Sequence, residues 1–169
     1  TAAGSLTLSG STSNTTLVPN ANITFGGSGA SRTVSITPAA NQSGSATITV
    51  TASDPSGGSG SDTFLLTVTS DNDQPTISLV SNRTIAEDGN TGSIAFTIGD
   101  TESAATLLTM GGASSDTTLV PTANTVLGGS GASRNVTVTP AANQFGTSTI
   151  TLTVSDPDGG SAQEPFVLT

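Results

Sequence analysis

The chain contains the same stretch of sequence twice, and this repetition constrains the fold more than any other feature. Residues 1–67 and 103–169 align without gaps at a constant offset, with about 41 identities in 67 positions. The matching runs include LVP at 17–19 and 119–121, GGSGASR at 26–32 and 128–134, and TPAANQ at 37–42 and 139–144. An offset of roughly a hundred residues is the size of a whole β-sandwich domain, and it is too long for a solenoid coil or a propeller blade. We therefore predict two domains of one kind in tandem.

The two copies are not equally complete, because residues 71–102 have no counterpart before residue 1. The predicted domains are 1–73 and 74–169, and on these boundaries the first lacks the opening strands of the second. A sandwich without its first strands has an open edge and an uncovered apolar face. We expect a further segment, from upstream chain or from a neighbouring molecule, to cover that face.

Alternating apolar residues predict seven strands in the second domain, separated by turns at 128–133 and 156–160. The residues that mark them are Ile77 and Leu79; Ile94, Phe96 and Ile98; Leu108 and Met110; Thr125 to Leu127; Val136 and Val138; Ile150, Leu152 and Val154; and Phe166 and Leu168. No segment has a helical period. The predicted fold is all-β: tandem immunoglobulin-like, Greek-key β-sandwiches of seven strands each, with the first truncated at its N-terminus. Phe64, Phe96 and Phe166 are assigned to the cores.

Composition removes most kinds of chemistry. The chain has no Cys, His, Lys, Trp or Tyr, and three Arg stand against twelve acidic residues, for a net charge of −9. Disulfides, thiol or imidazole catalysis and Cys/His zinc sites are therefore excluded, and nucleic acid is not an expected partner. A two-carboxylate glycosidase remains conceivable, but five Phe without Trp or Tyr line a sugar cleft poorly. We predict that the protein is not an enzyme and, without a long apolar run, does not insert directly into a membrane.

The acidic residues gather at positions that an immunoglobulin-like topology brings to one pole. The loops after the second and sixth strands lie at the same end as the entering linker, whereas Glu87 and Asp88 fall at the opposite end. Like charges repel unless a cation neutralises them, and Ca²⁺ takes six to eight oxygen ligands. The alternative is that Asp and Gly make a tight turn at 156–159 with no ion. The candidate calcium ligands are Asp71, Asp73, Asp100, Glu102, Asp156 and Asp158.

Four of these motifs together resemble the cadherin repeat. They are the linker Asn72-Asp73-Gln74-Pro75, Asp100-Thr101-Glu102 at the Asp-x-Asp position, Ser155-Asp156 with Gly159, and Glu87 in the first turn. The resemblance implies Ca²⁺ between successive domains, where it stiffens a rod. The linker is one residue shorter than in cadherins, and 40–42 (Ala-Asn-Gln) lies near the place of the missing Asp-Arg-Glu motif. We therefore expect one ion at a junction rather than three.

Repetition and resemblance together predict a structural spacer repeat of an extracellular bacterial surface protein, either an adhesin stalk or a fibre. Bacterial surface proteins carry long arrays of similar cadherin-like or immunoglobulin-like repeats. The expected partners are neighbouring repeats of the same array and identical chains in a filament. An adhesive ligand-binding module and a filament subunit assembled by strand complementation are the alternatives. The near-identity of the copies favours the spacer, because a binding tip would carry a divergent loop or domain.

Overall fold

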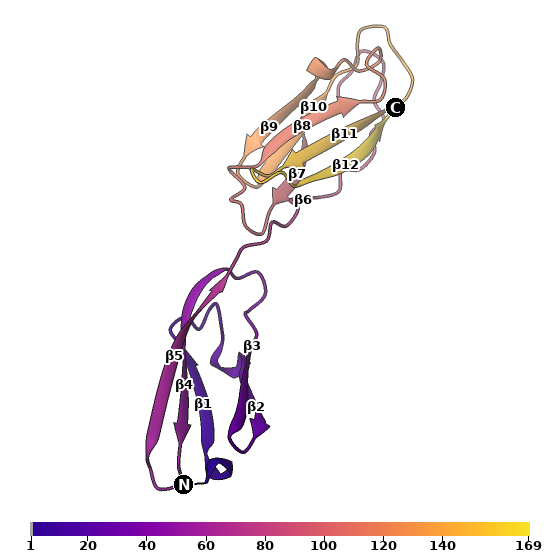
Figure 1. Ribbon diagram of the computed structural model, residues 1–169. Coiled ribbons are helices and arrows are strands. Elements are labelled where there is room, and N and C mark those ends of the chain that lie inside the picture. The colour runs from indigo at the N-terminus through magenta and orange to yellow at the C-terminus, as the bar shows by residue number, and fades with distance from the viewer. Residues whose placement is uncertain (1) are drawn as a thin grey trace. The chain divides into compact units, whose positions relative to one another are not determined.

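The computed structural model describes residues 2–169, and the chain divides into two compact units. Unit 1 is Thr1–Asp71 and unit 2 is Asn72–Thr169 (Figure 1). The described residues form strands and three short 3-10 turns, Ala3–Ser5, Asn20–Asn22 and Thr122–Asn124, with no α-helix among residues 2–169. No helix in this part of the chain is long and apolar enough to cross a membrane. The all-β prediction is confirmed.

Unit 2 consists of two antiparallel sheets, and all seven of its predicted strands are present. One sheet has the order β6 (Thr76–Ile77), β7 (Ile94–Gly99), β10 (Ser133–Val138), β9 (Thr125–Ser130). The other has the order β12 (Ser161–Leu168), β11 (Ser148–Ser155), β8 (Thr109–Ser114). This is the strand order of a seven-stranded immunoglobulin-type sandwich.

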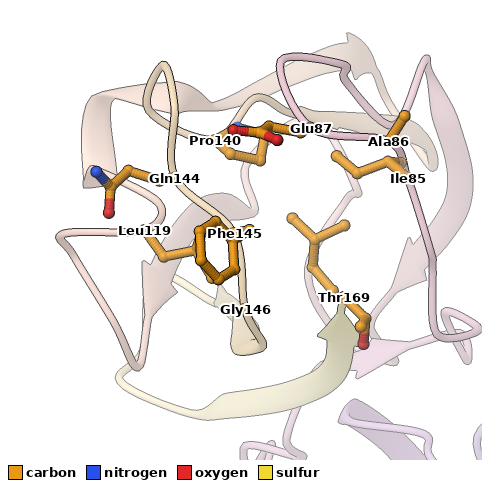
Figure 2. A pocket seen from close by; sticks show the side chains of 10 residues that line it. Ile85, Ala86, Glu87, Leu119, Pro140, Gln144, Phe145, Gly146 and Thr169 are labelled. Atoms are coloured by element: carbon orange, nitrogen blue, oxygen red, sulfur yellow. The ribbon is translucent and has the colours of Figure 1, made fainter.

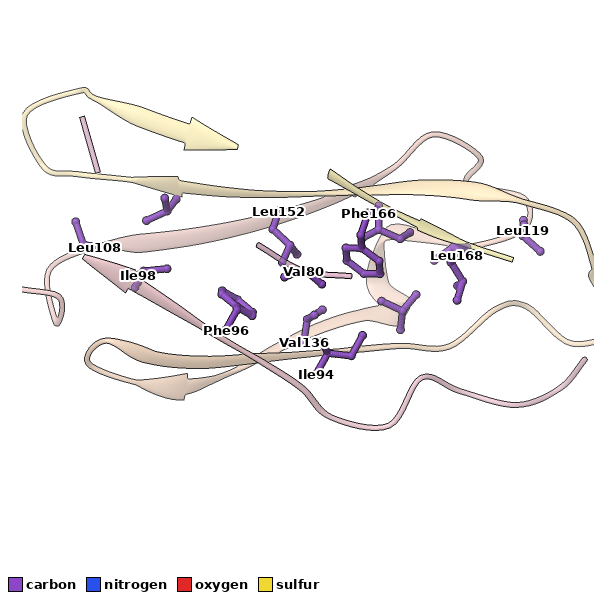
Figure 3. Close-up of a cluster of buried hydrophobic side chains, with 14 residues drawn as sticks. Val80, Ile94, Phe96, Ile98, Leu108, Leu119, Val136, Leu152, Phe166 and Leu168 are labelled. Atoms are coloured by element: carbon purple, nitrogen blue, oxygen red, sulfur yellow. The ribbon is translucent and has the colours of Figure 1, made fainter. Parts of the chain in front are cut away.

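The core of unit 2 lies between the two sheets (Figure 3). In β11 the inward residues Ile150, Leu152 and Val154 are fully buried, and the Thr residues between them are half-buried. Phe96 and Phe166 enter this core from opposite sheets.

One residue of the predicted first strand is placed differently by the structure. Leu79 is 88 % exposed, whereas Val80 is buried. The reason is that β6 ends at Ile77, after which the chain runs toward β12 and Arg83 bridges to Leu168. The alternation of a paired strand does not continue through this crossing.

Unit 1 has the same five later strands and no counterpart of β6 and β7 among its described residues. One sheet has the order β1 (Thr7–Thr12), β4 (Gly44–Ser53), β5 (Ser59–Val68), and the other pairs β2 (Ile23–Ser28) with β3 (Ser31–Ile36). At the offset of the sequence repeat these strands correspond to β8, β11, β12, β9 and β10. The described part of unit 1 therefore contains counterparts of the last five strands of unit 2.

The core of unit 1 is smaller and partly open. Its buried residues are Leu17, Val18, Ile23, Ala46 and Ile48. Phe64 is 41 % exposed, although its counterpart Phe166 is 1 % exposed. The prediction that Phe64 lies in a core is therefore wrong, because no segment in the described part of unit 1 covers the face to which it belongs.

Candidate functional site

Three loops of unit 2 meet where the chain enters this unit. They are residues 72–75, the 100–108 connection between β7 and β8, and the 156–160 turn between β11 and β12, and we call them the linker pole. Asn72 Nδ2 donates a hydrogen bond to Asp156 Oδ2 at 3.1 Å. The backbone N–H of Asp73 donates to Glu102 Oε2, also at 3.1 Å. The entering segment is thus tied to both other loops.

Asp156 is the most deeply placed acid of the linker pole, with 7 % of its surface exposed. Its Oδ1 accepts backbone N–H groups from Asp158 at 2.8 Å and Gly160 at 2.9 Å. Burial by itself raises the pKa of this carboxyl. Hydrogen bonds from the Asn72 amide and from backbone N–H groups of the turn outweigh that effect, so the pKa lies below its ordinary value of 3.8. Asp156 is therefore an ionised, hydrogen-bonded carboxylate.

The same turn occurs in unit 1, and a comparison shows which hydrogen bonds of Asp156 belong to the turn itself. Asp54 Oδ1 accepts backbone N–H groups from Ser56 at 2.8 Å and Gly58 at 2.9 Å. Its counterpart in unit 2 makes the same two kinds of bond, so these bonds are what an Asp-Pro-x-Gly turn forms by itself. The distinguishing features of Asp156 are its deeper burial and its bond to Asn72.

One carboxylate oxygen of Asp100 accepts hydrogen bonds, and the other has no hydrogen-bond partner among the described residues. Its Oδ1 accepts the backbone N–H of Glu102 at 3.0 Å and of Ser103 at 2.6 Å, which holds the start of the β7–β8 connection. Its Oδ2 is buried and has no hydrogen-bond partner among the described residues. A buried oxygen left unpaired costs free energy, so each such atom requires a physical explanation.

The predicted calcium ligands are only partly brought together. Asp73, Asp100, Glu102, Asp156 and Asp158 all belong to the three loops of the linker pole, while Asp71 is the last residue of unit 1. Asp73 and Asp158 take part through their backbone N–H groups. Among residues 2–169, no three acidic side chains are close enough together to hold a metal ion as they stand.

Asn72 contributes a side chain that sequence reasoning did not assign to the site. The linker motif includes Asn72, but the ligands predicted from the sequence are all carboxylates. The sequence does carry a signal for this role, since Asn72 precedes Asp73 in the linker. An Asn side-chain amide can donate a hydrogen bond to a nearby carboxylate, here that of Asp156.

The opposite end of unit 2 contains Glu87, Asp88 and the end of the last strand. The Asp88 carboxylate accepts the backbone N–H of Asn143 at 2.9 Å. The carbonyl oxygen of Thr169, which follows β12, accepts the backbone N–H of Ile85 at 2.9 Å. Glu87, Phe145 and Thr169 border a small apolar hollow there (Figure 2). Glu87 and Asp88 therefore lie away from the linker pole, as the topology predicts.

The strand order and the twofold occurrence of the sandwich define a tandem protein of the immunoglobulin-like class. A family model described as bacterial Ig domain matches residues 72–169, which is more than half of the chain. The chain belongs to this bacterial immunoglobulin-domain family. Among curated protein sequences, none matches this chain.

Solved structures with the same fold include cadherin repeats. Protocadherin gamma B2 extracellular cadherin domains 1–5 match with a TM-score of 0.56 and 15 % identity, covering 95 % of this chain and 31 % of that chain. A protocadherin gamma B7 cis-dimer structure matches with a TM-score of 0.53 and 18 % identity, covering 96 % and 39 %. Domains 4 and 5 of the S-layer protein SbsC match with a TM-score of 0.45 and 18 % identity, covering 98 % and 77 %. This chain spans less than half of each protocadherin chain, and the likeness to them is one of fold.

Proposed function

We propose that this chain is a spacer segment of an extracellular bacterial surface protein, in which each complete unit adds its length to a stalk or fibre. The carrying observation is that unit 2 has its entry and its last strand end at opposite poles. Asn72 is bonded to the 156–160 turn at one pole, whereas Thr169 is bonded to Ile85 at the other. With strands of this length, a unit and its linker span roughly 35 to 45 Å.

The gapless match between the two copies supports the spacer over a ligand-binding tip. A tip needs a loop that differs from those of its neighbours, and the alignment of 1–67 with 103–169 contains no insertion. The partners of such a spacer are the adjacent repeats of its own array. We expect no catalytic activity from it, because the chain has no His, Cys, Trp or Tyr, the side chains on which common hydrolytic sites and sugar clefts rely.

Small-angle scattering tests the spacer directly. A copy of residues 68–169 appended after Thr169 continues the repeat at its natural offset. The maximum dimension should then increase by about 40 Å relative to the unmodified chain. An increase below about 15 Å would mean that successive units fold back on one another, and it would contradict the spacer proposal.

We further propose that the linker pole binds one Ca²⁺, which neutralises its acids and holds the entering linker against unit 2. The support is the buried Asp100 Oδ2, since a cation would satisfy an oxygen that no donor reaches. Glu102 on the same connection and Asp156 on the 156–160 turn offer further carboxylate oxygens, the kind of ligand that Ca²⁺ prefers. To hold the ion, the carboxylates of Asp100, Glu102 and Asp156 would have to move closer together than they stand in this structure.

Thermal unfolding with and without Ca²⁺ tests this second proposal. At a free concentration of about 100 times the dissociation constant, the ion should stabilise unit 2 by about 2.7 kcal/mol. Asp100→Asn should abolish the effect, whereas Asp62→Asn, which removes the same charge from an exposed position in unit 1, should retain it. An unfolding midpoint that is unchanged by Ca²⁺ would contradict the ion site and leave the spacer proposal standing.

A further inference from the structure

The chain contains five Asn-x-Ser/Thr sequons, the acceptor motif of N-linked glycans. In such a motif the side-chain amide nitrogen of the Asn receives the sugar, and a hydroxyl residue must stand two positions later. A folded chain can be modified only where this amide is accessible and where the backbone around it can adapt to an enzyme, as exposed loops do. The five are at Asn14, Asn22, Asn41, Asn82 and Asn135.

Two of these sequons use their Asn side chain to hold unit 1 together. Asn14 Oδ1 accepts the backbone N–H of Leu17 at 3.1 Å, which closes the turn after β1. Asn22 Nδ2 donates to the carbonyl oxygen of Thr37 at 2.9 Å. Both Asn residues are only partly exposed. Modification of either would require a hydrogen bond of the fold to be given up.

Two more sequons lie in paired backbone of unit 2. Asn82 Oδ1 accepts the backbone N–H of Val167 at 2.8 Å, and the next residue, Arg83, bridges to Leu168. Asn135 is in β10, which pairs with β7 on one side and with β9 on the other. A paired segment must open before its backbone can adopt another conformation, and this opening costs free energy. These two sites are therefore poor acceptors in the folded chain.

The fifth sequon, Asn41-Gln42-Ser43, is free of such restraints. All three residues are exposed, and they belong to the 37–43 connection between β3 and β4. The side chain of Asn41 makes no hydrogen bond with any residue in 2–169, and its backbone carbonyl accepts the Gln42 side-chain amide at 3.1 Å. Asn41 has a φ of 56°, a left-handed turn conformation that Asn tolerates better than most residues.

Unit 2 shows that this exposure belongs to the turn itself. Asn143, the counterpart of Asn41, has a φ of 58° and is also exposed. It is exposed although the 86–90 turn lies against it, where the Asp88 carboxylate accepts the Asn143 backbone N–H. The two copies differ two positions later, where Phe145 stands in unit 2 and Ser43 in unit 1. The same exposed turn thus occurs once with the acceptor motif and once without it.

We propose that Asn41 is a glycan acceptor. The Asn41 Nδ2 atom attacks the anomeric carbon of a sugar that is carried on a phosphate group. An N–C bond forms, the C–O bond to the phosphate breaks, and the amide proton passes to a base of the transferase. The co-reactants are the activated sugar and a transferase that recognises Asn-x-Ser/Thr. This inference rests on the proposed function, because a protein of the cell surface passes through the export route, and it is independent of the calcium site.

The first test is an acceptor assay on the folded chain. The chain is incubated with such a transferase and either a nucleotide-linked or a lipid-linked sugar, and each Asn is followed by peptide mass spectrometry. Synthetic peptides of the five sequons supply the rates without the fold. Relative to its own peptide, Asn41 should react at least about tenfold faster than each of the other four sites, because it needs no opening of paired backbone.

A matched exchange between the two copies controls this assay. Ser43→Phe should abolish modification of Asn41, and Phe145→Ser should make Asn143 an acceptor at a similar rate. Phe145 is 85 % exposed, so this replacement removes no core contact. Absence of sugar at Asn41 with both kinds of donor, or equal relative rates at the five sites, would overturn the proposal.

The second test is mass spectrometry of the protein taken from the surface of the cells that produce it. The peptide that contains Asn41 should carry a sugar, and the peptide that contains Asn143 should not. An unmodified Asn41 in surface protein would overturn the glycan proposal and leave the spacer standing. Absence of the protein from the surface would instead contradict the proposed function on which this inference rests.

Discussion

Units 1 and 2 share a repeated sequence over five strands, with about 41 identities in 67 positions, yet they bury it to different extents. Val136 is fully buried and Val34 is 38 % exposed; Phe166 is 1 % exposed and Phe64 is 41 % exposed. By contrast Ile48 and Ile150 are both fully buried, because each lies in the middle strand of its sheet. The comparison shows that burial near the sheet edges is set by residues 76–99, and not by the repeated sequence itself.

The largest expected difference between the units concerns these two phenylalanines. Phe166→Ala should lower the free energy of unfolding of unit 2 by about 3–5 kcal/mol, because it leaves a cavity in a closed core. Phe64→Ala should cost unit 1 about 1 kcal/mol, since much of that ring already contacts water. Denaturant titrations followed by NMR signals assigned to each unit would separate the two effects.

The control for this comparison uses positions that are equally buried in both units. Ile48→Ala and Ile150→Ala should each cost about 2–5 kcal/mol, with similar values in the two units. Equal losses for the two phenylalanine variants would break the comparison, because they would mean that the face of unit 1 is covered in solution.

A smaller difference is expected at the paired turns. A Cβ added at Gly160 would collide with Asp156 Oδ2 and lie 3.1 Å from Asn72 Nδ2, whereas one at Gly58 would meet Asp54 Oδ2 at 3.1 Å. Gly160→Ala should therefore destabilise unit 2 by about 1–3 kcal/mol, and Gly58→Ala should affect unit 1 less. Thermal unfolding of the two variants tests this, and a larger loss from Gly58→Ala would contradict it.

The smallest expected effect is the pH dependence that Asp156 gives to the stability of unit 2. The pKa of Asp156 is lower in the folded state than its ordinary value of 3.8, so the folded protein binds this proton less readily than the unfolded chain. The resulting stabilisation is present above that ordinary value and is lost as the pH falls through the folded pKa. Asn72→Ala removes one of the bonds that lower this pKa and should shift the NMR titration of the Asp156 carboxyl upward.

The corresponding control is the acid stability of unit 1. Asn72 is hydrogen-bonded to the 156–160 turn of unit 2, so Asn72→Ala should leave the acid unfolding of unit 1 unchanged. A titration of Asp156 that does not move in this variant would show that the amide does not set its pKa.

Much of the fold was predictable, because the repeat and the apolar alternation can both be recognised in the sequence without knowledge of tertiary contacts. The apolar residues in the strands around Ile94, Val136 and Ile150 alternate with a period of two. The alignment of the two copies then predicts counterparts of the last five strands in unit 1. The errors at Leu79 and Phe64 both concern tertiary arrangement, which alternation within a strand does not encode. The exposure of Leu79 depends on the path of the chain after β6, and that of Phe64 on the lack of a covering segment in the described part of unit 1.

The candidate site was predictable to the level of its loops. An immunoglobulin-like topology brings the linker, the 100–108 connection and the 156–160 turn together, and their hydrogen bonds show that they do meet. The individual roles were not predictable. Whether Asp100 Oδ2 finds a donor and whether Asn72 reaches Asp156 depend on side-chain placement within a few tenths of an ångström.

Amide hydrogen exchange in the unmodified chain tests most directly whether the same strands are closed in one unit and open in the other. The amides of Val136 and Val138 should exchange only through large-scale unfolding of unit 2, because β7 covers that edge. Those of Val34 and Ile36 should exchange at least about 100-fold faster, since they face an unpaired edge. Equal protection of the two pairs would show that unit 1 closes this face by itself, and it would contradict the account.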